Sequence, residues 1–107
     1  MNFKEYQKQA IVTKKKWDDK NFEMMYLAMS LAGESGEVIE IIKKHMRDGR
    51  EIDIEKLKYE IGDVMWYIAS LCDCMGFDMG EVAHMNIEKL RKRHGGSFSG
   101  YGNRSGE

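Results

Sequence analysis

The stretch that decides the fold is residues 53–76, DIEKLKYEIGDVMWYIASLCDCMG. Its apolar residues recur at spacings of three and four, at Leu57, Ile61, Val64, Ile68, Leu71 and Met75. A helix completes one turn in about 3.6 residues, so these side chains form a seam along one side of a helix. Asp53 is the expected N-cap, and Gly76 is the expected end. We therefore predict one long helix between these two residues.

A second long helix is predicted before this stretch, from about Phe22 to Met46. Its apolar seam follows spacings of four, seven and three, at Leu27, Leu31, Val38 and Ile41. The pattern is again that of a helix, and it ends at Asp48-Gly49, a dipeptide that favours a turn. Because only a short connection separates the two long helices, we expect them to pack antiparallel as a hairpin.

Two shorter helices complete the prediction. The first runs from Phe3 to Lys15. The last begins after Asp78, where Glu81 forms a variant of the capping box, and it runs to about His94. A tail rich in Gly and Ser follows at residues 95–107 and is expected to be mobile. The expected fold class is therefore all-α, a four-helix bundle-like domain over residues 1–94.

Composition and charge exclude several classes of function. The 107 residues suit one domain, and 17 basic against 18 acidic residues leave a net charge of −1. This balance gives no reason to expect binding to nucleic acid or to a membrane surface. No stretch has the length and apolarity of a membrane span, and the N-terminus lacks the apolar core of a signal peptide. The basic run Lys14-Lys15-Lys16 is interpreted as a solvated helix end.

The two cysteines are expected to be reduced thiols. Cys72 and Cys74 lie two positions apart on the predicted helix, where side chains do not face each other. A disulfide between them is not expected, and no second cysteine pair exists to complete a zinc site. Reduced thiols are consistent with a cytoplasmic protein.

Four acidic residues carry the functional hypothesis. Glu34 and Glu37 are three apart on one predicted helix, and Glu60 and Asp63 are three apart on the next. Residues three apart share a helix face, so an antiparallel hairpin can bring the two pairs opposite each other. Glu34 lies in an apolar seam and Glu60 beside one, where an uncompensated carboxylate is costly. We therefore predict that all four are catalytic residues and ligands of Mg²⁺, with Mn²⁺ as a possible substitute.

Two glycines flank Glu34. Gly33 and Gly36 each cost about 1 kcal/mol relative to Ala inside a helix. They indicate the close approach of another helix or of a ligand, and the structural alternative is a helix end near Gly33. A single acidic pair on a helix is usually a solvated surface. Two pairs, both beside apolar seams, favour the metal site.

Two segments resemble the signature motifs of the MazG-like all-α nucleoside triphosphate pyrophosphohydrolases. They are GESGEV at residues 33–38 and EIGDVMWY at residues 60–67, which fit the patterns Glu-x-x-Glu and Glu-x-x-Asp. Residues 86–93, NIEKLRKR, resemble the Asn-x-x-Lys-Leu segment near the C-terminus of that family. Residues 6–13 resemble its N-terminal helix. The resemblance covers about residues 3–94.

The resemblance implies a reaction and an assembly. The reaction is the hydrolysis of a nucleoside triphosphate between its α and β phosphates, which gives a nucleoside monophosphate and pyrophosphate. Its role would be control of the nucleotide pool or removal of damaged nucleotides. The four acids would hold Mg²⁺, which would bridge phosphate oxygens and help to activate water. The assembly would be a homodimer or a homotetramer of helical bundles.

The resemblance also implies substrate-binding residues. Tyr67 lies one turn after Asp63 and would contact the nucleotide. Asn86, Lys89 and Arg93 share one helix face and would meet sugar and phosphates. The sequence departs from some relatives at Lys44, where they carry an aromatic residue that stacks on the base. Trp17 is the alternative stacking residue, or else an anchor of packing.

Two other classes of function remain as alternatives. A di-iron or di-manganese carboxylate bundle combines Glu residues with Glu-x-x-His motifs, and Glu81 and His84 have that spacing. Only one such motif exists, and Glu81 is already assigned to a helix cap. A non-catalytic helical interaction module would use its apolar faces to bind a partner, and binding surfaces rich in methionine exist, as the nine methionines of the chain would allow. It would leave the four carboxylates unexplained.

Overall fold

The computed structural model describes residues 1–95, and within this range it contains helices and connections but no strand. The elements are α1 (Phe3–Ala10), a short 3-10 helix η1 (Ile11–Thr13), α2 (Lys20–Asp48), α3 (Ile54–Met75) and α4 (Met79–Arg93). The predicted all-α fold class is confirmed. The predicted mobile tail, from residue 96 onward, lies outside the described residues.

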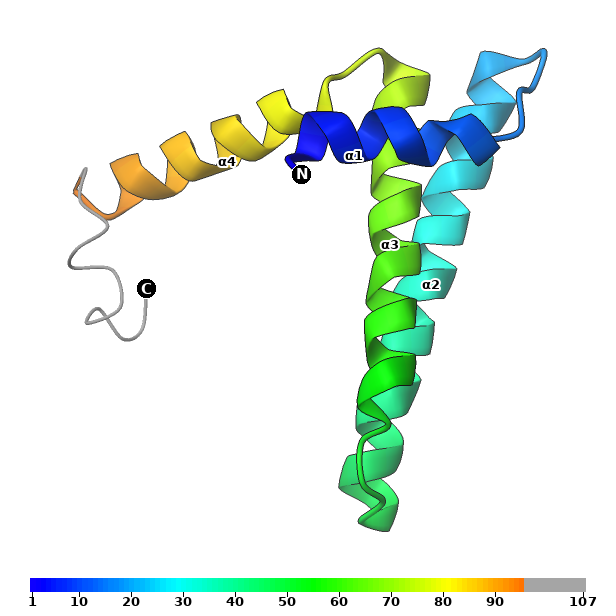
Figure 1. The fold of residues 1–107 in the computed structure, drawn as a ribbon, viewed down its shortest axis with the longest axis vertical. Helices are drawn as coiled ribbons and strands as arrows, with labels where there is room; N and C mark the ends of the chain where they lie inside the picture. The colour runs from blue at the N-terminus through cyan, green and yellow to red at the C-terminus, as the bar shows by residue number, and fades with distance from the viewer. Residues whose placement is uncertain (96–107) are drawn as a thin grey trace.

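α2 and α3 form the predicted antiparallel hairpin and are the most extensive contact between elements (Figure 1). Gly49 ends α2 with a φ of 68°, and Gly76 ends α3 with a φ of 78°. A residue without Cβ adopts this left-handed backbone without a steric cost. Asp53 caps α3 as predicted, since its side chain accepts a hydrogen bond from the Lys56 N–H at 3.1 Å. The hairpin therefore begins and ends where its local sequence directs.

The best-packed part of the molecule lies where α1 crosses the C-terminal half of α3. Ala69, Cys72 and Met79 are buried there. Tyr6, Ala10 and Ile68 pack against them, half-buried. We call this region the junction, because α1, α3 and the start of α4 meet in it.

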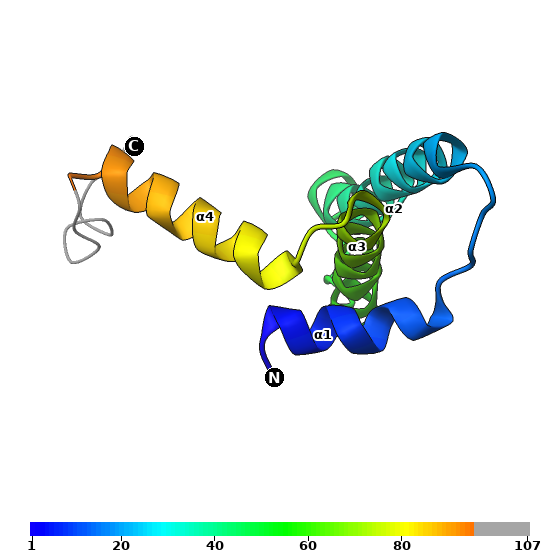
Figure 2. The ribbon, with the colours of Figure 1, turned by 90° about the horizontal axis from the view of Figure 1, so that it is seen from above.

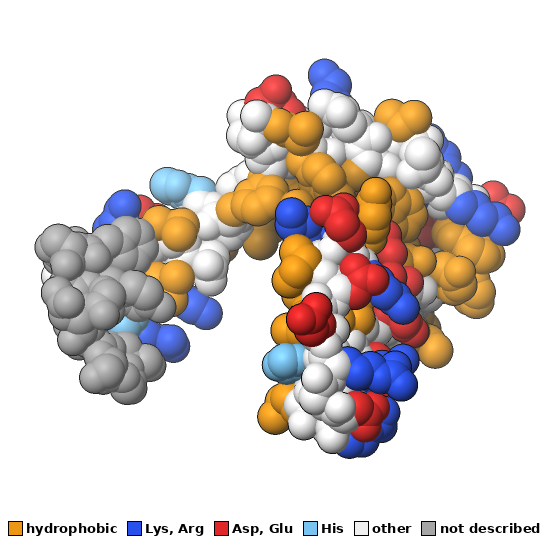
Figure 3. All heavy atoms as spheres, turned by 60° about the horizontal axis from the view of Figure 1, so that its bottom comes forward, with side chains coloured by type: hydrophobic (Ala, Val, Ile, Leu, Met, Phe, Trp, Pro, Cys, Tyr) orange, Lys and Arg blue, Asp and Glu red, His pale blue; other side chains and the backbone are white. Residues whose placement is uncertain are grey.

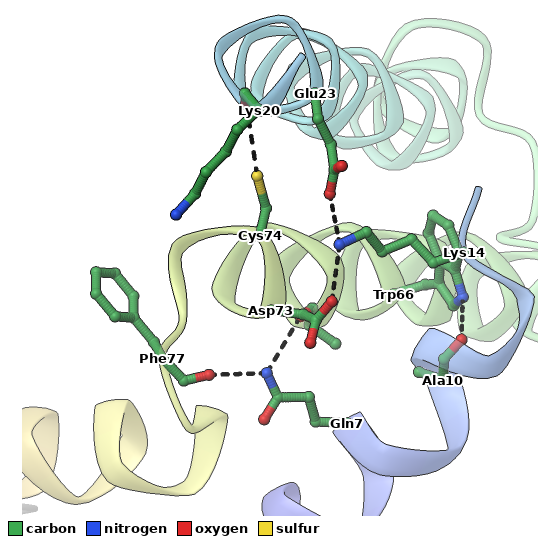
Figure 4. A network of polar contacts seen from close by, with 10 residues as sticks. Gln7, Ala10, Lys14, Lys20, Glu23, Trp66, Asp73, Cys74 and Phe77 are labelled. Atoms are coloured by element: carbon green, nitrogen blue, oxygen red, sulfur yellow. Dashed lines mark hydrogen bonds and ion pairs between the residues drawn. The ribbon is translucent and has the colours of Figure 1, made fainter. Parts of the chain in front are cut away.

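Gln7 joins three elements in the junction. Its side chain is buried. Its Nε2 donates to the carbonyl oxygens of Phe77 at 2.9 Å and Ala69 at 3.4 Å (Figure 4). Its Oε1 accepts the Met79 N–H at 2.9 Å. The nitrogen and the oxygen of this buried amide therefore both have hydrogen-bond partners, and these bonds connect α1 to the turn between α3 and α4.

Lys14 joins the junction to α2. Its ammonium group pairs with Glu23 on α2 and, at 2.8 Å, with Asp73 on α3, and the side chains of Lys14 and Glu23 are only 9% and 10% exposed (Figure 4). The interpretation of Lys14 as part of a solvated helix end was therefore wrong. The predicted helix from Phe3 to Lys15 also ends early, because the chain leaves the helical path after η1 and Lys14 turns toward its partners.

α4 projects away from the hairpin. It packs against α1 and against the C-terminal end of α3, and in the described part of the chain it makes no contact with α2. Figures 1 and 2, seen from two directions at right angles, both show α4 extending outward from the junction. Among residues 1–95, only α1 and α3 therefore pack against α4.

Two local predictions need correction. The helix end considered near Gly33 is wrong, because α2 continues to Asp48. A Cβ added at Gly33 or Gly36 would meet nothing within 4 Å among the described residues, so this chain itself makes no close approach there.

The capping box predicted at the start of α4 is not formed. Asp78 accepts a hydrogen bond from the Gly80 N–H at 2.8 Å, and the box forms instead in α1, between Asn2 and Glu5. None of the described helices has the length and apolarity that crossing a membrane requires.

Candidate metal centre

Three of the four predicted acids meet on the hairpin. One carboxylate oxygen each from Glu34, Glu60 and Asp63 can be chosen such that all three lie within 4.8 Å of one another. Glu34 comes from α2 and the other two from α3, so the antiparallel packing brings them together. Glu34 and Glu60 are half-buried, and Asp63 is exposed. We call these three residues the acid group.

The fourth predicted acid, Glu37, lies beside the acid group. It is exposed and is not within the same 4.8 Å set. Its charge still reaches the group. Burial raises the pKa of the Glu34 carboxyl, and the charges of Asp63, Glu60 and Glu37 raise it further. All four carboxylates therefore contribute to one region of negative electrostatic potential.

The donor set of the acid group suits a hard divalent cation. It offers carboxylate oxygens from two helices and neither sulfur nor imidazole, a combination that favours Mg²⁺ or Mn²⁺ over zinc. The raised pKa of Glu34 means that burial and the neighbouring carboxylates disfavour its ionised form. A bound cation would reverse that cost, because it would place an opposite charge against the carboxylates. The residues present therefore fit the predicted metal.

An aromatic hollow of about 160 Å³ lies on the α1 side of the acid group. It contains both aromatic residues predicted to bind the nucleotide, Trp17 and Tyr67. The Trp17 ring packs 5.3 Å from the ring of Tyr26, and the Lys15 Nζ lies 4.2 Å from its centroid. The full lining is Thr13, Lys14, Lys15, Trp17, Tyr26, Leu27, Trp66 and Tyr67. Trp17 thus packs against other rings and also faces a hollow.

A charged hollow of about 430 Å³ lies on the other side, toward the tip of the hairpin. Glu37 and Lys44 both line it, so Lys44 stands beside an acid and apart from the aromatic hollow. The full lining is Glu37, Glu40, Ile41, Lys44, His45, Arg50, Glu51, Asp53 and Lys56. Figure 3 shows acidic side chains along the hairpin and basic side chains gathered near its tip. The acid group therefore lies between an aromatic neighbourhood and one of mixed charge.

The three predicted substrate residues of α4 do not reach the acid group of the same chain. Asn86, Lys89 and Arg93 are all exposed. They lie on the helix that projects from the junction and that does not contact α2 in the described residues. The same placement separates Glu81 and His84 from the acid group, so among residues 1–95 this pair does not join the three carboxylates.

The sequence prediction missed Tyr26, Arg50 and Lys56. Lys56 could have been found, because it lies four residues before Glu60 and so on the same side of α3. Tyr26 lies next to Leu27 on α2, but only the path of residues 14–19 shows that it faces Trp17. Arg50 follows the turn at Gly49, where no periodic pattern assigns a side chain to a face.

Comparison with known proteins agrees with this geometry. The MazG nucleotide pyrophosphohydrolase domain matches residues 22–98, which include the hairpin, the acid group and α4. The chain belongs to the MazG nucleotide pyrophosphohydrolase family. The Gene 37 protein of Mycobacterium phage L5 is 35% identical to this chain over 74 residues. That match covers 65% of each chain, so the alignment spans about two thirds of the phage protein. No solved structure matches the chain.

Proposed function

We propose that this protein is a Mg²⁺-dependent nucleoside triphosphate pyrophosphohydrolase that cleaves between the α and β phosphates. The observation that carries the proposal is the convergence of Glu34, Glu60 and Asp63 from two helices of a chain in this family. Three carboxylates that face one another without a cation are unfavourable, and a phosphate-bound divalent metal is the partner that suits them. The products are a nucleoside monophosphate and pyrophosphate.

The acids position the phosphates for attack by water. When bound, Mg²⁺ supplies charge against the phosphate oxygens and lowers the pKa of a bound water. Glu34 and Glu60, half-buried and anchored on facing helices, would hold the cation. Asp63 and Glu37, which are exposed at the open edge, would supply the remaining carboxylate ligands. Mn²⁺ would serve in place of Mg²⁺, because it accepts the same oxygen ligands.

The two hollows suggest how the nucleotide lies along the hairpin. Leu27 in the aromatic hollow is seven residues before Glu34, which is about 10 Å along α2. We propose that the base enters this hollow near Trp17 and Tyr67 while the phosphates meet the acid group. The charged hollow, with Lys44, Arg50 and Lys56, then receives the pyrophosphate end. These three cations offer donors to phosphate oxygens, and they share the hollow with four acids, Glu37, Glu40, Glu51 and Asp53.

The function is tested by incubating the purified protein with common and modified nucleoside triphosphates in the presence of Mg²⁺. Monophosphate and pyrophosphate are the expected products, and chelation of the metal should stop their release. Orthophosphate and diphosphate as products would show that another bond is cleaved. The matched variants are Glu60→Gln, which removes a charge of the acid group, and Glu55→Gln, which removes an exposed charge of the first turn of α3. Only the first should abolish turnover.

A further inference from the structure

The aromatic hollow is small for a whole nucleotide. Its volume is about 160 Å³, whereas pockets that enclose a drug-sized ligand usually measure about 300–1,000 Å³. Four aromatic rings contribute to its lining, those of Trp17, Tyr26, Trp66 and Tyr67. Aromatic rings stack on the face of any base, so stacking alone does not select one base over another. Selection therefore depends on the polar groups that meet the edge of the base.

Several polar groups of the lining already have partners. The Thr13 hydroxyl donates to the Ala10 carbonyl at 3.1 Å and accepts the Trp66 N–H at 3.1 Å. The Lys14 ammonium pairs with two carboxylates that are not part of the lining. These contacts fix the wall of the hollow, and a base would have to break them in order to use the same atoms.

The Lys15 ammonium is placed differently. Its Nζ lies 4.2 Å from the centroid of the Trp17 ring, a cation–π contact, and its side chain is exposed. None of the ion pairs found among residues 1–95 includes it. The described lining also contains no Asp or Glu. An ammonium has three donors and no acceptor, so the hollow offers a base a charged donor without a charged acceptor.

Lys15 lies at the end of the hollow that is farther from the acid group. The ring that it contacts is 4.8 Å from the ring of Phe22. Phe22 precedes Glu34 by twelve residues, about 18 Å along α2. Tyr67, at the nearer end, follows Asp63 by only four residues, about 6 Å along α3. A nucleotide with its phosphates at the acid group would therefore direct the edge of its base that is remote from the sugar toward Lys15.

We propose that Lys15 selects bases with a carbonyl oxygen at this remote edge, as in uracil, thymine, hypoxanthine and guanine, over the amino-bearing bases cytosine and adenine. The carbonyl oxygen accepts a hydrogen bond from the ammonium, whereas an amino group presents its own N–H donors there. This inference rests on the proposed function, because the position of the phosphates decides which edge of the base reaches Lys15.

Two pairs of substrates test the inference. UTP and CTP differ at the remote edge by a carbonyl against an amino group, and ITP and ATP differ in the same way. In the presence of Mg²⁺, kcat/KM should be about tenfold higher for the carbonyl-bearing member of each pair, which is the effect of one hydrogen bond to a charged group. Equal values within the pairs, or a preference for CTP and ATP, would overturn the inference.

Lys15→Met removes the ammonium and keeps an unbranched side chain. The preference within each pair should then fall from about tenfold to about one. Lys16→Met is the matched control, because Lys16 is exposed, belongs to the same basic run and is not part of the lining. It should keep the ratios of the parent, and equal melting temperatures check that both variants fold. Parental ratios in Lys15→Met would show that another group selects the base, and would overturn the inference.

Binding separates the failure of this inference from the failure of the proposed function. The α,β-imido analogues of UTP and CTP resist cleavage between the α and β phosphates. They are titrated into the parent and Lys15→Met, and binding is followed by the fluorescence of Trp17 and Trp66, which both line the hollow. The UTP analogue should bind about tenfold more tightly to the parent, and the two analogues should bind equally to the variant.

The two measurements have distinct outcomes. If the parent cleaves no triphosphate but binds the UTP analogue more tightly, the proposed reaction fails and the selection by Lys15 stands. Equal binding of the two analogues to the parent, or no change in fluorescence with either of them, would overturn the inference even if triphosphates are cleaved.

Discussion

The junction and the acid group both contain carboxylates of α3, but only those of the junction are paired with a cation of the chain. In the junction, Asp73 and Glu23 share Lys14, so the negative charges next to the core are neutralised within the chain. About three turns earlier on α3, Asp63 and Glu60 face Glu34, and no described Lys or Arg forms an ion pair with any of them. The chain therefore supplies a cation where acids hold helices together. Among the described residues it supplies none to the three carboxylates of the acid group.

This contrast predicts that replacing an acid has opposite effects on stability in the two regions. Asp63→Asn should lower turnover by roughly 10³-fold, because the ligand that positions the metal and the phosphates is lost. The same change should raise the melting temperature without Mg²⁺, since one of several repelling charges disappears. Kinetics of pyrophosphate release and thermal unfolding with and without Mg²⁺ are the measurements.

Mg²⁺ should raise the melting temperature of the parent, and the rise should shrink in Asp63→Asn and in Glu37→Ala. Glu55→Gln is the control and should respond to Mg²⁺ as the parent does. An equal response in all four proteins would mean that these acids do not hold the metal and that the contrast between the two regions is not functional.

Lys14→Met should produce the largest loss of stability. It leaves Glu23, whose side chain is 10% exposed, without its cation, and breaking such a buried pair costs about 3 kcal/mol. Chemical denaturation measures the difference. Lys16→Met is the matched control from the same basic run, and its exposed side chain should make it nearly neutral. Equal stability of the two variants would show that the Lys14 network does not stabilise the fold.

The same network predicts a dependence on pH. The hydrogen bond that Glu23 accepts from Lys14 lowers the pKa of the Glu23 carboxyl below its ordinary value of 4.5. A lowered pKa in the folded state contributes stability above 4.5, which is lost as the pH falls through the lower, folded value. The stability difference between the parent and Lys14→Met, measured by denaturation at several pH values, should therefore shrink on acidification. A constant difference would contradict this assignment.

Gln7→Leu should cost about 2 kcal/mol, less than the loss of Lys14. Leucine is of similar size but has no polar atoms, so the Met79 N–H and the Phe77 carbonyl lose their partner, and unpaired buried groups cost about 1–3 kcal/mol. The exposed Gln9→Leu is the control. Equal unfolding midpoints for the two variants would show that the amide contributes nothing to the junction.

Ser70→Ala should have the smallest effect. Ser70 on α3 is fully buried, yet its Oγ has no hydrogen-bond partner among the described residues. Removing an unsatisfied hydroxyl should leave the free energy of unfolding within about 0.5 kcal/mol of the parent, or increase it. Thermal and chemical unfolding measure this change. A clear loss of stability would mean that the hydroxyl has a partner, such as water.

Features that depend on residues close together in the sequence could be predicted, and features that depend on contacts between distant residues could not. The two long helices and the hairpin were predictable, because their seams and the glycines at positions 49 and 76 are local signals. The acid group was predictable as well, since spacings of three on two adjacent helices restrict where the acids can lie. The end of α1 was not, because Lys14 is drawn out of the helical path by Glu23 and Asp73. The direction of α4 depends in the same way on Gln7, whose bonds no local pattern encodes.

The hydrogen bonds of Gln7 also bear on the order of folding. They join residues 62 to 72 positions apart, whereas α2 and α3 are consecutive and can pair as soon as both exist. Closing a longer loop costs more chain entropy, so we expect the hairpin to form early and α1 to dock late. On the ribosome α1 emerges first, yet its partner Met79 is made more than seventy residues afterwards. Among the described helices, we therefore expect α1 to have the longest interval between its synthesis and its docking.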